Sequence, residues 1–533
     1  MMQNSLKYFH PAWIQKDTRI LHADLCVYGG TSAGIIAAVK GRRLGLSAII
    51  CNPGLHLGGL SSGGLGFTDF GNKVIIGGLS RDFYKRIGLR YGLPEIWKFE
   101  PHIAESVFHE LIKEFDIPVC SAAYLDHVDM TAKRITEISF LGGLRVKAKS
   151  FVDATYEGDL MAKARVSYTV GREDNTQYGE TCNGFQIHNK HQFDYPVDPY
   201  IIPGHPGSGL LSGIRGEDAG PEGRGDSLLQ AYNFRVCMTD DPEIRVPFPK
   251  PEHYDPKEYT LCARWLASLM NSVKAHESNF LDDAIFRKFD RITAVKTDTN
   301  NHGAFSTDYI GANHRWPDAG YEEREGLFQK HVTYQQGLHW FMANDPSVPG
   351  PIRGTYAAWG LVKDEFLDTM HWPHQLYIRE ARRMVSDIVM SERHCVGAMN
   401  VDDPVGMGAY QMDSHNCQRI VRDGHVLNEG DVQMRLEAPY AISYRAIIPK
   451  TGECENLSVP VCASASHIAF GSIRMEPVFM ILAESAVEAA ALALKNNASL
   501  QDVPYKSLKE KILQSGQIVN VQTKNSGPSN PND

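Results

Sequence analysis

The chain has 533 residues, which exceeds the size at which one hydrophobic core usually stops growing, so we expect two packed domains. With 43% hydrophobic and 22% charged residues, the composition is that of a globular protein and excludes global disorder. The net charge of -9 argues against nucleic-acid and anionic-membrane partners, which need clustered positive charge, and favours a small-molecule partner.

Neither the N-terminus nor the cysteines indicate export. The N-terminus lacks the basic start and apolar stretch of a secretory signal, and we find no run of about 20 apolar residues that predicts a membrane span. We therefore expect a cytoplasmic protein. The ten cysteines include no close pair, which argues against a dithiol relay and an iron–sulfur cluster. No set of side chains has the spacing of a metal site.

The first elements in chain order form a strand, turn, helix and strand. A short buried strand is predicted at 24–28, a helix at 33–44 directly after a glycine turn, and a second strand at 47–51. This series begins a doubly wound α/β fold. The glycine-dense stretch 54–78 suits backbone that packs closely against a ligand.

The pattern changes after residue 178. Before it, a helix is predicted at 103–115 and two strands within 134–154. After it come long loops rich in Pro, Trp, Tyr and His, with helices at 259–273 and 374–390. Within the second of these helices, residues 377–384 are expected to expose a charged face.

The chain returns to strand and helix after residue 440 and ends with an alanine-rich helix at 477–495. Its last residues are rich in Asn, Ser, Pro and Gly, which is typical of a mobile end. The predicted organisation is an N-terminal part of a nucleotide-binding domain at 20–178, a mixed α+β substrate domain at 179–439, the C-terminal part of the first domain at 440–514, and a flexible tail at 515–533.

A dinucleotide-binding turn is predicted between the first strand and the first helix. Gly29 permits the tight turn, Gly34 lets the helix pack against the strand, and the free amides of the helix start face a pyrophosphate. Thr31 stands where the usual fingerprint has its second glycine. Asn52 follows the second strand, where an acidic residue normally binds ribose hydroxyls, and its amide oxygen still accepts one such bond.

Several later segments extend this pattern. Leu57-Gly58-Gly59 is a pairing found in flavoproteins rather than in nicotinamide dehydrogenases, and Gly63-Gly64-Leu65-Gly66 follows it. Further along lie the segments 151–159, 443–449 and 464–477. Together, over roughly residues 24–494, they resemble the bacterial FAD-dependent oxidoreductase family of the glutathione-reductase-like superfamily.

The resemblance implies FAD as the cofactor and a Rossmann-like, glutathione-reductase-type FAD domain with an inserted substrate domain. A helix that begins near Pro477 would place its N-terminus under the isoalloxazine ring, where reduced flavin carries negative charge. The resemblance implies that the cofactor is bound by Gly29, Gly30, Thr31, Ser32, Ala33, Gly34, Asn52, Pro53, Gly58, Gly59, Leu60, Ser61, Gly64, Leu65, Asp153, Ala154, Thr155, Asp159, Ser472, Arg474, Pro477 and Val478.

The catalytic candidates are a histidine base and nearby polar residues. Residues 412–415 resemble the family's Asp-x-His segment near the flavin, and His415 is the first candidate for the base that takes an alcohol proton, because imidazole titrates near neutral pH. His467 is the second candidate. Arg445, which follows Tyr444 in the segment leading back to the flavin, and Arg474 are candidates for holding an oxyanion or a substrate carboxylate, or for fixing the loop beneath FAD.

Aromatic rings alternate with hydrogen-bonding side chains in the middle of the chain. Sugars need that mixture, because ring faces stack on apolar surfaces while hydroxyls need donors and acceptors. The candidates for substrate contacts are Asn300, His302, Trp316, His371 and His374.

These observations predict an FAD-dependent dehydrogenase or oxidase that acts on a CH–OH group of a polyhydroxylated, carbohydrate-derived molecule. No second dinucleotide site is recognised, so a separate electron acceptor is expected, or a second substrate at the same face. Two alternatives stay open: a redox-neutral, flavin-assisted elimination or isomerisation, and a flavin-binding protein without turnover.

Overall fold

The central sheet combines parallel and antiparallel strands. The computed structural model describes residues 6–216, 220–272 and 279–520. This sheet has seven strands: β1 (Ile20–Tyr28), β2 (Ala48–Cys51), β3 (Val119–Cys120), β4 (Leu125–Thr131), β5 (Arg134–Phe140), β6 (Arg145–Asp153) and β20 (Leu457–Ser458).

The strand order is β3-β2-β1-β6-β5-β4, and β20 pairs with β6. β1 runs parallel to β2 and β6, whereas β4, β5 and β6 pair antiparallel. The last four residues of β1 are all buried, which is typical of a central parallel strand with both faces covered. The predicted strands at 24–28 and 47–51 are confirmed.

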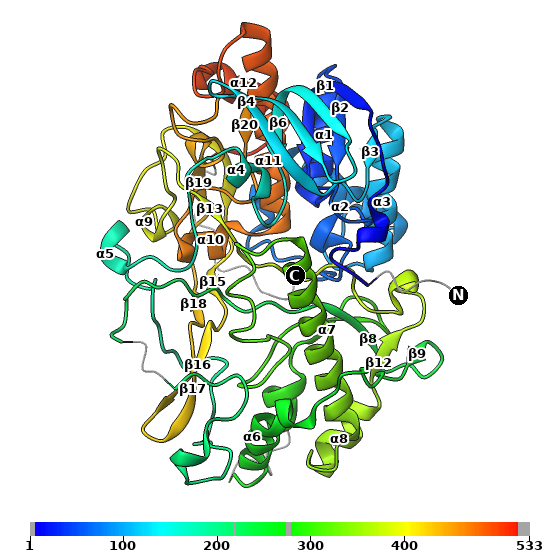
Figure 1. Ribbon diagram of the computed structural model, residues 1–533, viewed down its shortest axis with the longest axis vertical. Coiled ribbons are helices and arrows are strands. Elements are labelled where there is room, and N and C mark those ends of the chain that lie inside the picture. The colour runs from blue at the N-terminus through cyan, green and yellow to red at the C-terminus, as the bar shows by residue number, and fades with distance from the viewer. Residues whose placement is uncertain (1–5, 217–219, 273–278, 521–533) are drawn as a thin grey trace.

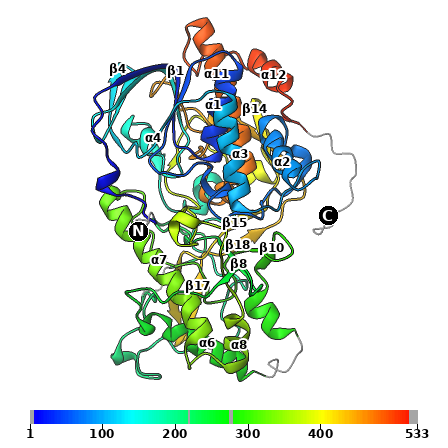
Figure 2. The ribbon, with the colours of Figure 1, turned by 90° about the vertical axis from the view of Figure 1, so that its right-hand side faces the viewer.

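Helices from both ends of the chain pack on this sheet. The fully buried stretch of α1 lies beside α11, so the two ends of the sequence form one layer (Figure 2). The predicted helices at 33–44, 103–115 and 477–495 are confirmed. The helices of this part are α1 (Ser32–Arg43), α2 (Gly78–Arg90), α3 (Pro101–Glu114), α4 (Asp159–Lys163), α11 (Glu476–Asn496) and α12 (Tyr505–Gln514).

The hydropathy of α11 corrects the expectation that no apolar run is long enough to span a membrane. Its 21 residues include an 18-residue window with a mean hydropathy of 1.7. However, 83% of that window is buried inside the protein, which is the pattern of a core helix.

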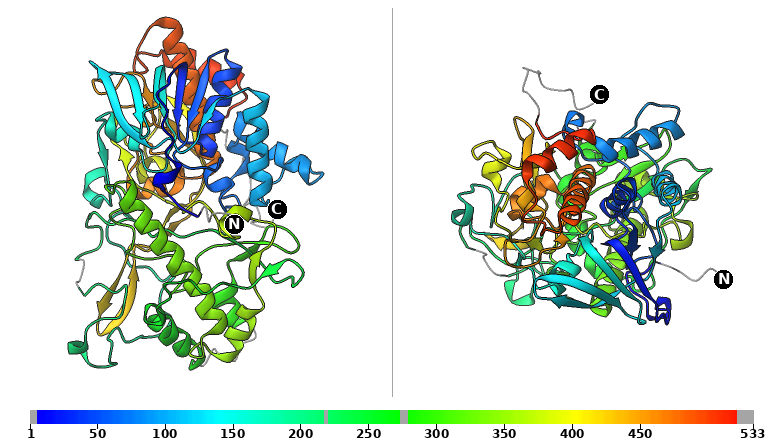
Figure 3. Two further views of the ribbon diagram at one scale, coloured as in Figure 1. Left: turned by 45° about the vertical axis from the view of Figure 1, so that its right-hand side comes forward. Right: turned by 90° about the horizontal axis from the view of Figure 1, so that it is seen from above.

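The lower part of the molecule holds an antiparallel sheet and the helices that pack beside it (Figure 1). The long helix α7 (Tyr321–Asn344) rises along it toward the central sheet (Figure 3). The predicted helix at 259–273 is observed as α6 (Thr260–Met270), beside α8 (Gly350–Ala357). The strands, in the order β10-β11-β8-β12-β9, are β8 (Val236–Thr239), β9 (Arg245–Val246), β10 (Phe289–Arg291), β11 (Thr297–Thr299) and β12 (Gly360–Val362).

Short elements connect the two parts. The strand β14 (Pro404–Gly408) lies within the predicted substrate domain, but it pairs with β19 (Tyr440–Ser443) and packs against α11. The short elements are β7 (Tyr168–Thr169), α5 (Asn175–Tyr178), β13 (Arg383–Met384), α9 (Glu392–Cys395), β14 (Pro404–Gly408), β15 (Met412–Ser414), β16 (Gln418–Arg422), β17 (His425–Glu429), β18 (Val432–Met434), β19 (Tyr440–Ser443) and α10 (His467–Ile473).

The predicted helix at 374–390 is wrong. This segment is extended and irregular, and the charged residues of 377–384 are buried rather than exposed. Arg383, for example, has a fully buried side chain that donates to Glu173 at 2.7 Å and lies 3.4 Å from Glu380. The closest partners of the three arginines are distant in the sequence, so their helical spacing does not reflect ion pairs along a helix.

The prediction of a flexible tail at 515–533 is wrong for residues 515–520. Ser515 bonds Lys40, and the carbonyl of Gly516 accepts from the amide of Gly78 at 3.1 Å. Val519 is buried. Residues 515–520 therefore belong to the packed protein, and the rest of the predicted tail, 521–533, lies outside the described residues.

Candidate cofactor and catalytic site

The glycine turn after β1 has the close packing that its sequence predicts. Gly29 has a φ of +106°, and a Cβ there would lie 2.9 Å from the backbone carbon of Ala154. A Cβ on Gly34 would lie 1.9 Å from the carbonyl oxygen of Gly29. The Thr31 hydroxyl caps α1 by accepting from the amide of Gly34 and donates to the carbonyl of Ala154. Thr31 thus has a structural use at the position of the missing glycine.

Gly34→Ala is expected to weaken FAD binding at least about tenfold and to destabilise the fold by about 1–3 kcal/mol, because overpacking forces α1 away from β1. FAD titration and urea denaturation measure both effects. Gly326→Ala is the control, since this glycine lies within α7 and a Cβ there meets nothing within 4 Å. That control is expected to leave FAD affinity unchanged, and equal behaviour of the two variants would contradict the packing argument.

Asn52 does not reach outward as a ribose ligand does. Its Oδ1 accepts from the amide of Gly30 at 2.9 Å, and its Nδ2 donates to the carbonyls of Gly54 and His56 at 3.0 and 2.8 Å. The carboxamide therefore holds the loop after β2 against the glycine turn. A carboxylate lacks the donor for the last two bonds, which explains an amide at this position.

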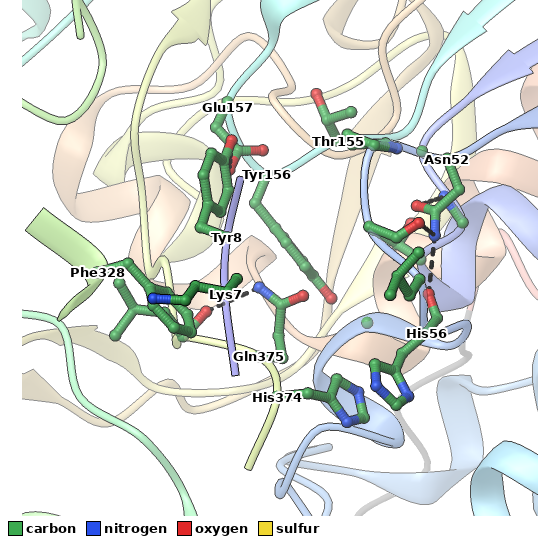
Figure 4. Close-up of a pocket in the computed structure, with 18 of the residues that line it drawn as sticks. Lys7, Tyr8, Asn52, His56, Thr155, Tyr156, Glu157, Phe328, His374 and Gln375 are labelled. Carbon is green, nitrogen blue, oxygen red and sulfur yellow. Dashed lines mark hydrogen bonds between the residues drawn. The ribbon is translucent and has the colours of Figure 1, made fainter. Parts of the chain in front are cut away.

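A cavity extends from this turn toward the lower part (Figure 4). Seven of the predicted cofactor residues line it, and the amides at the start of α1 are free of intrahelical partners, as at every helix start. A narrow cleft with a glycine floor and a helix N-terminus fits a dinucleotide. The predicted residues that line it are Gly29, Gly30, Thr31, Asn52, Pro53, Gly59 and Thr155.

Glu476 connects three segments around this cavity. Its carboxylate accepts hydrogen bonds from the hydroxyls of Ser32, Ser61 and, at 2.7 Å, Tyr156. Burial raises the pKa of Glu476, against the effect of these three hydroxyl donors. The Tyr156 hydroxyl also accepts from the amide of Leu60 at 2.9 Å. Glu476 and Tyr156 were not among the residues predicted to bind the cofactor, although Glu476 stands in the first turn of α11, where an acidic residue is favoured.

Two stacked histidines line the cavity. His56 and His374 have ring centroids 3.8 Å apart, with the planes nearly parallel. Burial alone would lower the pKa of His56, but Asp368 and Glu105 outweigh it and raise that pKa to about 9. Burial and the charge of His56 lower the pKa of His374 to about 3. One ring is therefore charged and its neighbour neutral at pH 7.

His56→Gln is expected to change the pH dependence of stability. The pKa of His56 is higher in the folded state, so its stabilising contribution, on the order of 2 kcal/mol, is present below about pH 6.5 and is lost as pH rises to about 9. Urea denaturation between pH 6 and 9.5 measures it. The control His374→Gln should shift the curve without changing its slope above about pH 7.5, where His374 is neutral in both the folded and the unfolded state, and parallel curves for His56→Gln and the wild type would contradict the assignment.

His415 lies in a buried polar cluster between the two parts. Its Nδ1 is 2.7 Å from Asp308 Oδ2, and its Nε2 is 3.4 Å from Asp413 Oδ2. Arg474, at the end of α10, donates to the same Asp413 carboxylate at 3.0 Å. Burial opposes the ionisation of Asp308, but Arg379 and His415 outweigh it and lower the pKa of Asp308.

The cluster balances its charges. Arg379 and Arg474 lie over the Tyr377 ring, and three buried guanidinium groups are each paired with a carboxylate: Arg235 with Asp298, Arg379 with Asp308, and Arg474 with Asp413. Within the described part of the chain, one nitrogen of each guanidinium has no hydrogen-bond partner. The cluster lies close to the glycine-rich loop, because a Cβ on Gly64 would meet the carbonyl oxygen of Arg235 at 2.0 Å.

His467, the second base candidate, forms a separate chain of hydrogen bonds. Its Nε2 lies 2.9 Å from the hydroxyl of Ser414, and its Nδ1 lies 2.8 Å from Glu380. All three side chains are buried. His467 therefore supports the strand segment that ends next to His415.

Tyr444 and Arg445 do not join this cluster. The Tyr444 hydroxyl donates to the carbonyl of Leu500, and the partly exposed Arg445 pairs with Asp403 at 2.9 Å. The expectation that these two residues act on substrate is therefore wrong, because their partners hold the end of β19 to neighbouring segments instead. Both follow a strand that passes the site, so sequence alone does not show which side they face.

The other predicted cofactor residues lie near the glycine turn, in the hydrophobic core or in ion pairs. Asp153 accepts from Thr155 and from the amide of Met161, and Asp159 pairs with two arginines. Ser472 bonds Tyr440 and the carbonyl of Tyr410. Gly58 forms an isolated parallel β-bridge with Thr31. Ala33, Ala154, Leu60, Leu65, Pro477 and Val478 are buried against these elements.

The predicted substrate residues separate into four places. Asn300 and His302 line a second cavity in the lower part, with Trp265, Phe289 and Thr307. Trp316 is fully buried, and its ring lies 4.9 Å from that of Tyr8. His371 contacts the carbonyl of Glu365, whereas His374 belongs to the cofactor cavity. The sequence did not show that only one pair shares a cavity.

Solved structures with partial similarity contain flavin enzymes. They include a mutant flavin monooxygenase from Stenotrophomonas maltophilia (16% identity, TM-score 0.19, 29% of this chain and 42% of that chain). Others are an L-amino acid deaminase from Proteus vulgaris (14%, 0.24, 30% and 54%) and a bacillithiol disulfide reductase from Staphylococcus aureus (16%, 0.20, 25% and 38%). The matched regions span about half or less of those chains. No curated protein matches the sequence.

A family model matches most of the chain. It covers residues 24–512, from β1 to α12, and therefore the cavity-lining residues from Gly29 to Leu376. The glycine turn, the cavity and this match agree on the cofactor, which is FAD. The chain belongs to the FAD dependent oxidoreductase family.

Proposed function

We propose that the protein oxidises a CH–OH group of a polyhydroxylated, carbohydrate-derived small molecule in the cytoplasm, with a separate electron acceptor. The His415–Asp308 pair carries this proposal. Asp308 contacts His415 Nδ1 at 2.7 Å, so it fixes the orientation of the ring, and Nε2 lies 3.4 Å from Asp413 Oδ2. His415 would take the hydroxyl proton through Nε2.

FAD, when bound, supplies the acceptor for the hydride that leaves the same carbon. The protein's own groups bind and orient the substrate. Three guanidiniums and their carboxylates offer donors and acceptors with little net charge, which suits neutral hydroxyl groups. Buried N–H groups without partners cost about 1–3 kcal/mol each, so a ligand with oxygen acceptors would relieve that cost.

The FAD-binding part is proposed to be of the glutathione-reductase type, with the substrate part inserted. The parallel order of β2, β1 and β6 and the glycine turn after β1 support this assignment.

Anaerobic reduction of the flavin tests the proposal. The FAD-loaded protein is mixed with neutral sugars, methyl glycosides and uronates, and the absorbance of oxidised flavin is followed. Bleaching by neutral polyols is the expected result. An unchanged spectrum with the whole panel would count against the proposal, and faster bleaching by the uronates would show that the charge-balance argument is wrong.

A further inference from the structure

The segment before β1 forms one wall of the cofactor cavity. Residues 6–13, here called the N-terminal strap, contribute Lys7, Tyr8 and Trp13 to the cavity lining. Figure 4 shows Lys7 and Tyr8 on the side opposite Asn52 and His56. The strap precedes residues 24–512, which the family model matches.

One end of the strap is fixed to α7 in the lower part. The carboxylate of Glu325 accepts from the backbone amides of Tyr8 and Phe9 at 2.8 and 3.0 Å, and it lies 3.4 Å from Lys7 Nζ. Gln329 donates to the carbonyl of Leu6 at 2.9 Å. A single carboxylate thus holds two consecutive amides, and without it both would lack this acceptor.

The middle of the strap contacts Glu157, in the segment that follows β6. The Tyr8 hydroxyl donates to Glu157 at 3.0 Å, and Arg324 donates to the same hydroxyl at 3.3 Å. Glu157 itself lines the cavity. The Tyr8 ring contacts Trp316 edge to face, which fixes the side chain from behind.

The other end of the strap reaches the central sheet. The Phe9 ring packs 4.8 Å from that of Tyr124, and beyond the strap the amide of Asp17 donates to the carbonyl of Gly142 at 2.9 Å. The strap and the residues that follow it therefore lead from α7 to the β5–β6 turn along the side of the cavity. A dinucleotide bound in the cavity would lie between the strap and the glycine turn.

From these contacts we infer that the N-terminal strap belongs to the FAD site, with Tyr8 as a cofactor contact, and that its attachment to Glu325 controls FAD release. FAD leaves only after the strap opens. Because binding and closure are linked, bound FAD must also keep the strap closed.

The primary test is the rate at which FAD dissociates from the loaded protein. The fluorescence of the released FAD after dilution measures this rate. Glu325→Ala is expected to raise this rate at least about tenfold, because it removes the acceptor of two backbone amides and the partner of Lys7. Tyr8→Phe, which removes only the hydroxyl, should raise it about threefold. Glu322→Ala, at an exposed position three residues before Glu325 on α7, is the matched control and should leave the rate unchanged.

Trypsin cleavage after Lys7 gives a second readout that needs no catalysis. FAD should slow this cleavage in the wild type, and Glu325→Ala should reduce the protection. If Glu325→Ala lowers the melting temperature of the apoprotein, Tyr8→Ala replaces it in both measurements. Rates of FAD release that stay within twofold of the wild type in these variants, with cleavage at Lys7 indifferent to FAD, would overturn the inference whatever the substrate is.

Discussion

His415→Asn is expected to lower the rate of anaerobic flavin reduction by about 10²- to 10⁴-fold while the protein keeps its FAD. Asparagine preserves much of the size of histidine but removes the proton acceptor. The ring of His415 is held by Asp308 at 2.7 Å, so Asp308→Asn should cause a smaller loss and shift the pH profile of the rate. Stopped-flow absorbance measures the rate, and the flavin spectrum measures FAD content.

The matched control for this prediction is His425→Asn. His425 is exposed on the β16–β17 hairpin, away from the buried cluster. Its substitution should leave both rate and FAD content unchanged. A His415→Asn protein that reduces its flavin within threefold of the wild-type rate would remove His415 as the base and leave the buried His467 to be tested.

Asp159→Asn is expected to lower the free energy of unfolding by about 3–5 kcal/mol. Asp159 bonds Arg324 from α7 at 2.6 Å and Arg382 at 2.7 Å, and both arginines are buried. Removing the carboxylate charge leaves two buried cations without compensation. Because Arg324 belongs to α7, the loss also weakens the attachment between the two parts. Urea denaturation measures it.

The pH dependence of stability gives an independent check on Asp159. Burial opposes its ionised form, but the two arginines outweigh burial and lower the pKa of Asp159 to about 2. The contribution is therefore complete above about pH 4 and is lost as pH falls toward 2. Asp82→Asn is the control, since this exposed partner of Arg86 should contribute less than about 0.5 kcal/mol. A loss below 1 kcal/mol in Asp159→Asn would contradict the role of the ion pairs.

The sequence predicted the cofactor fingerprint because that information is local. Gly29 and Gly34 are required by backbone contacts within one turn, and the apolar, alanine-containing runs of α1 and α11 are visible without a structure. The same local reasoning failed for residues 374–390. The charges of Arg379, Arg382 and Arg383 have helical spacing, but their partners lie far away in the sequence, and burial against those partners determined an extended conformation.

The cluster around His415 combines sequence and structure. His415 was selected from a local resemblance, whereas Asp308 comes from one loop and Tyr377 and Arg379 come from another, with no common motif. Tyr444 and Arg445 show the reverse case, because a resemblance placed them near the flavin and their actual partners, Leu500 and Asp403, do not lie in the cluster.

By itself the sequence determined the mixed α/β fold, the FAD turn and the family, since each rests on short-range periodicity or on contacts within a turn. Only the tertiary structure decided that Glu476 joins three cofactor segments, that Asp308 holds His415, and that the N-terminal strap closes the cavity. Those arrangements depend on pairs of residues hundreds of positions apart. Their physical cause is burial, which compels each polar group to find a partner wherever the folded chain brings one within hydrogen-bond distance.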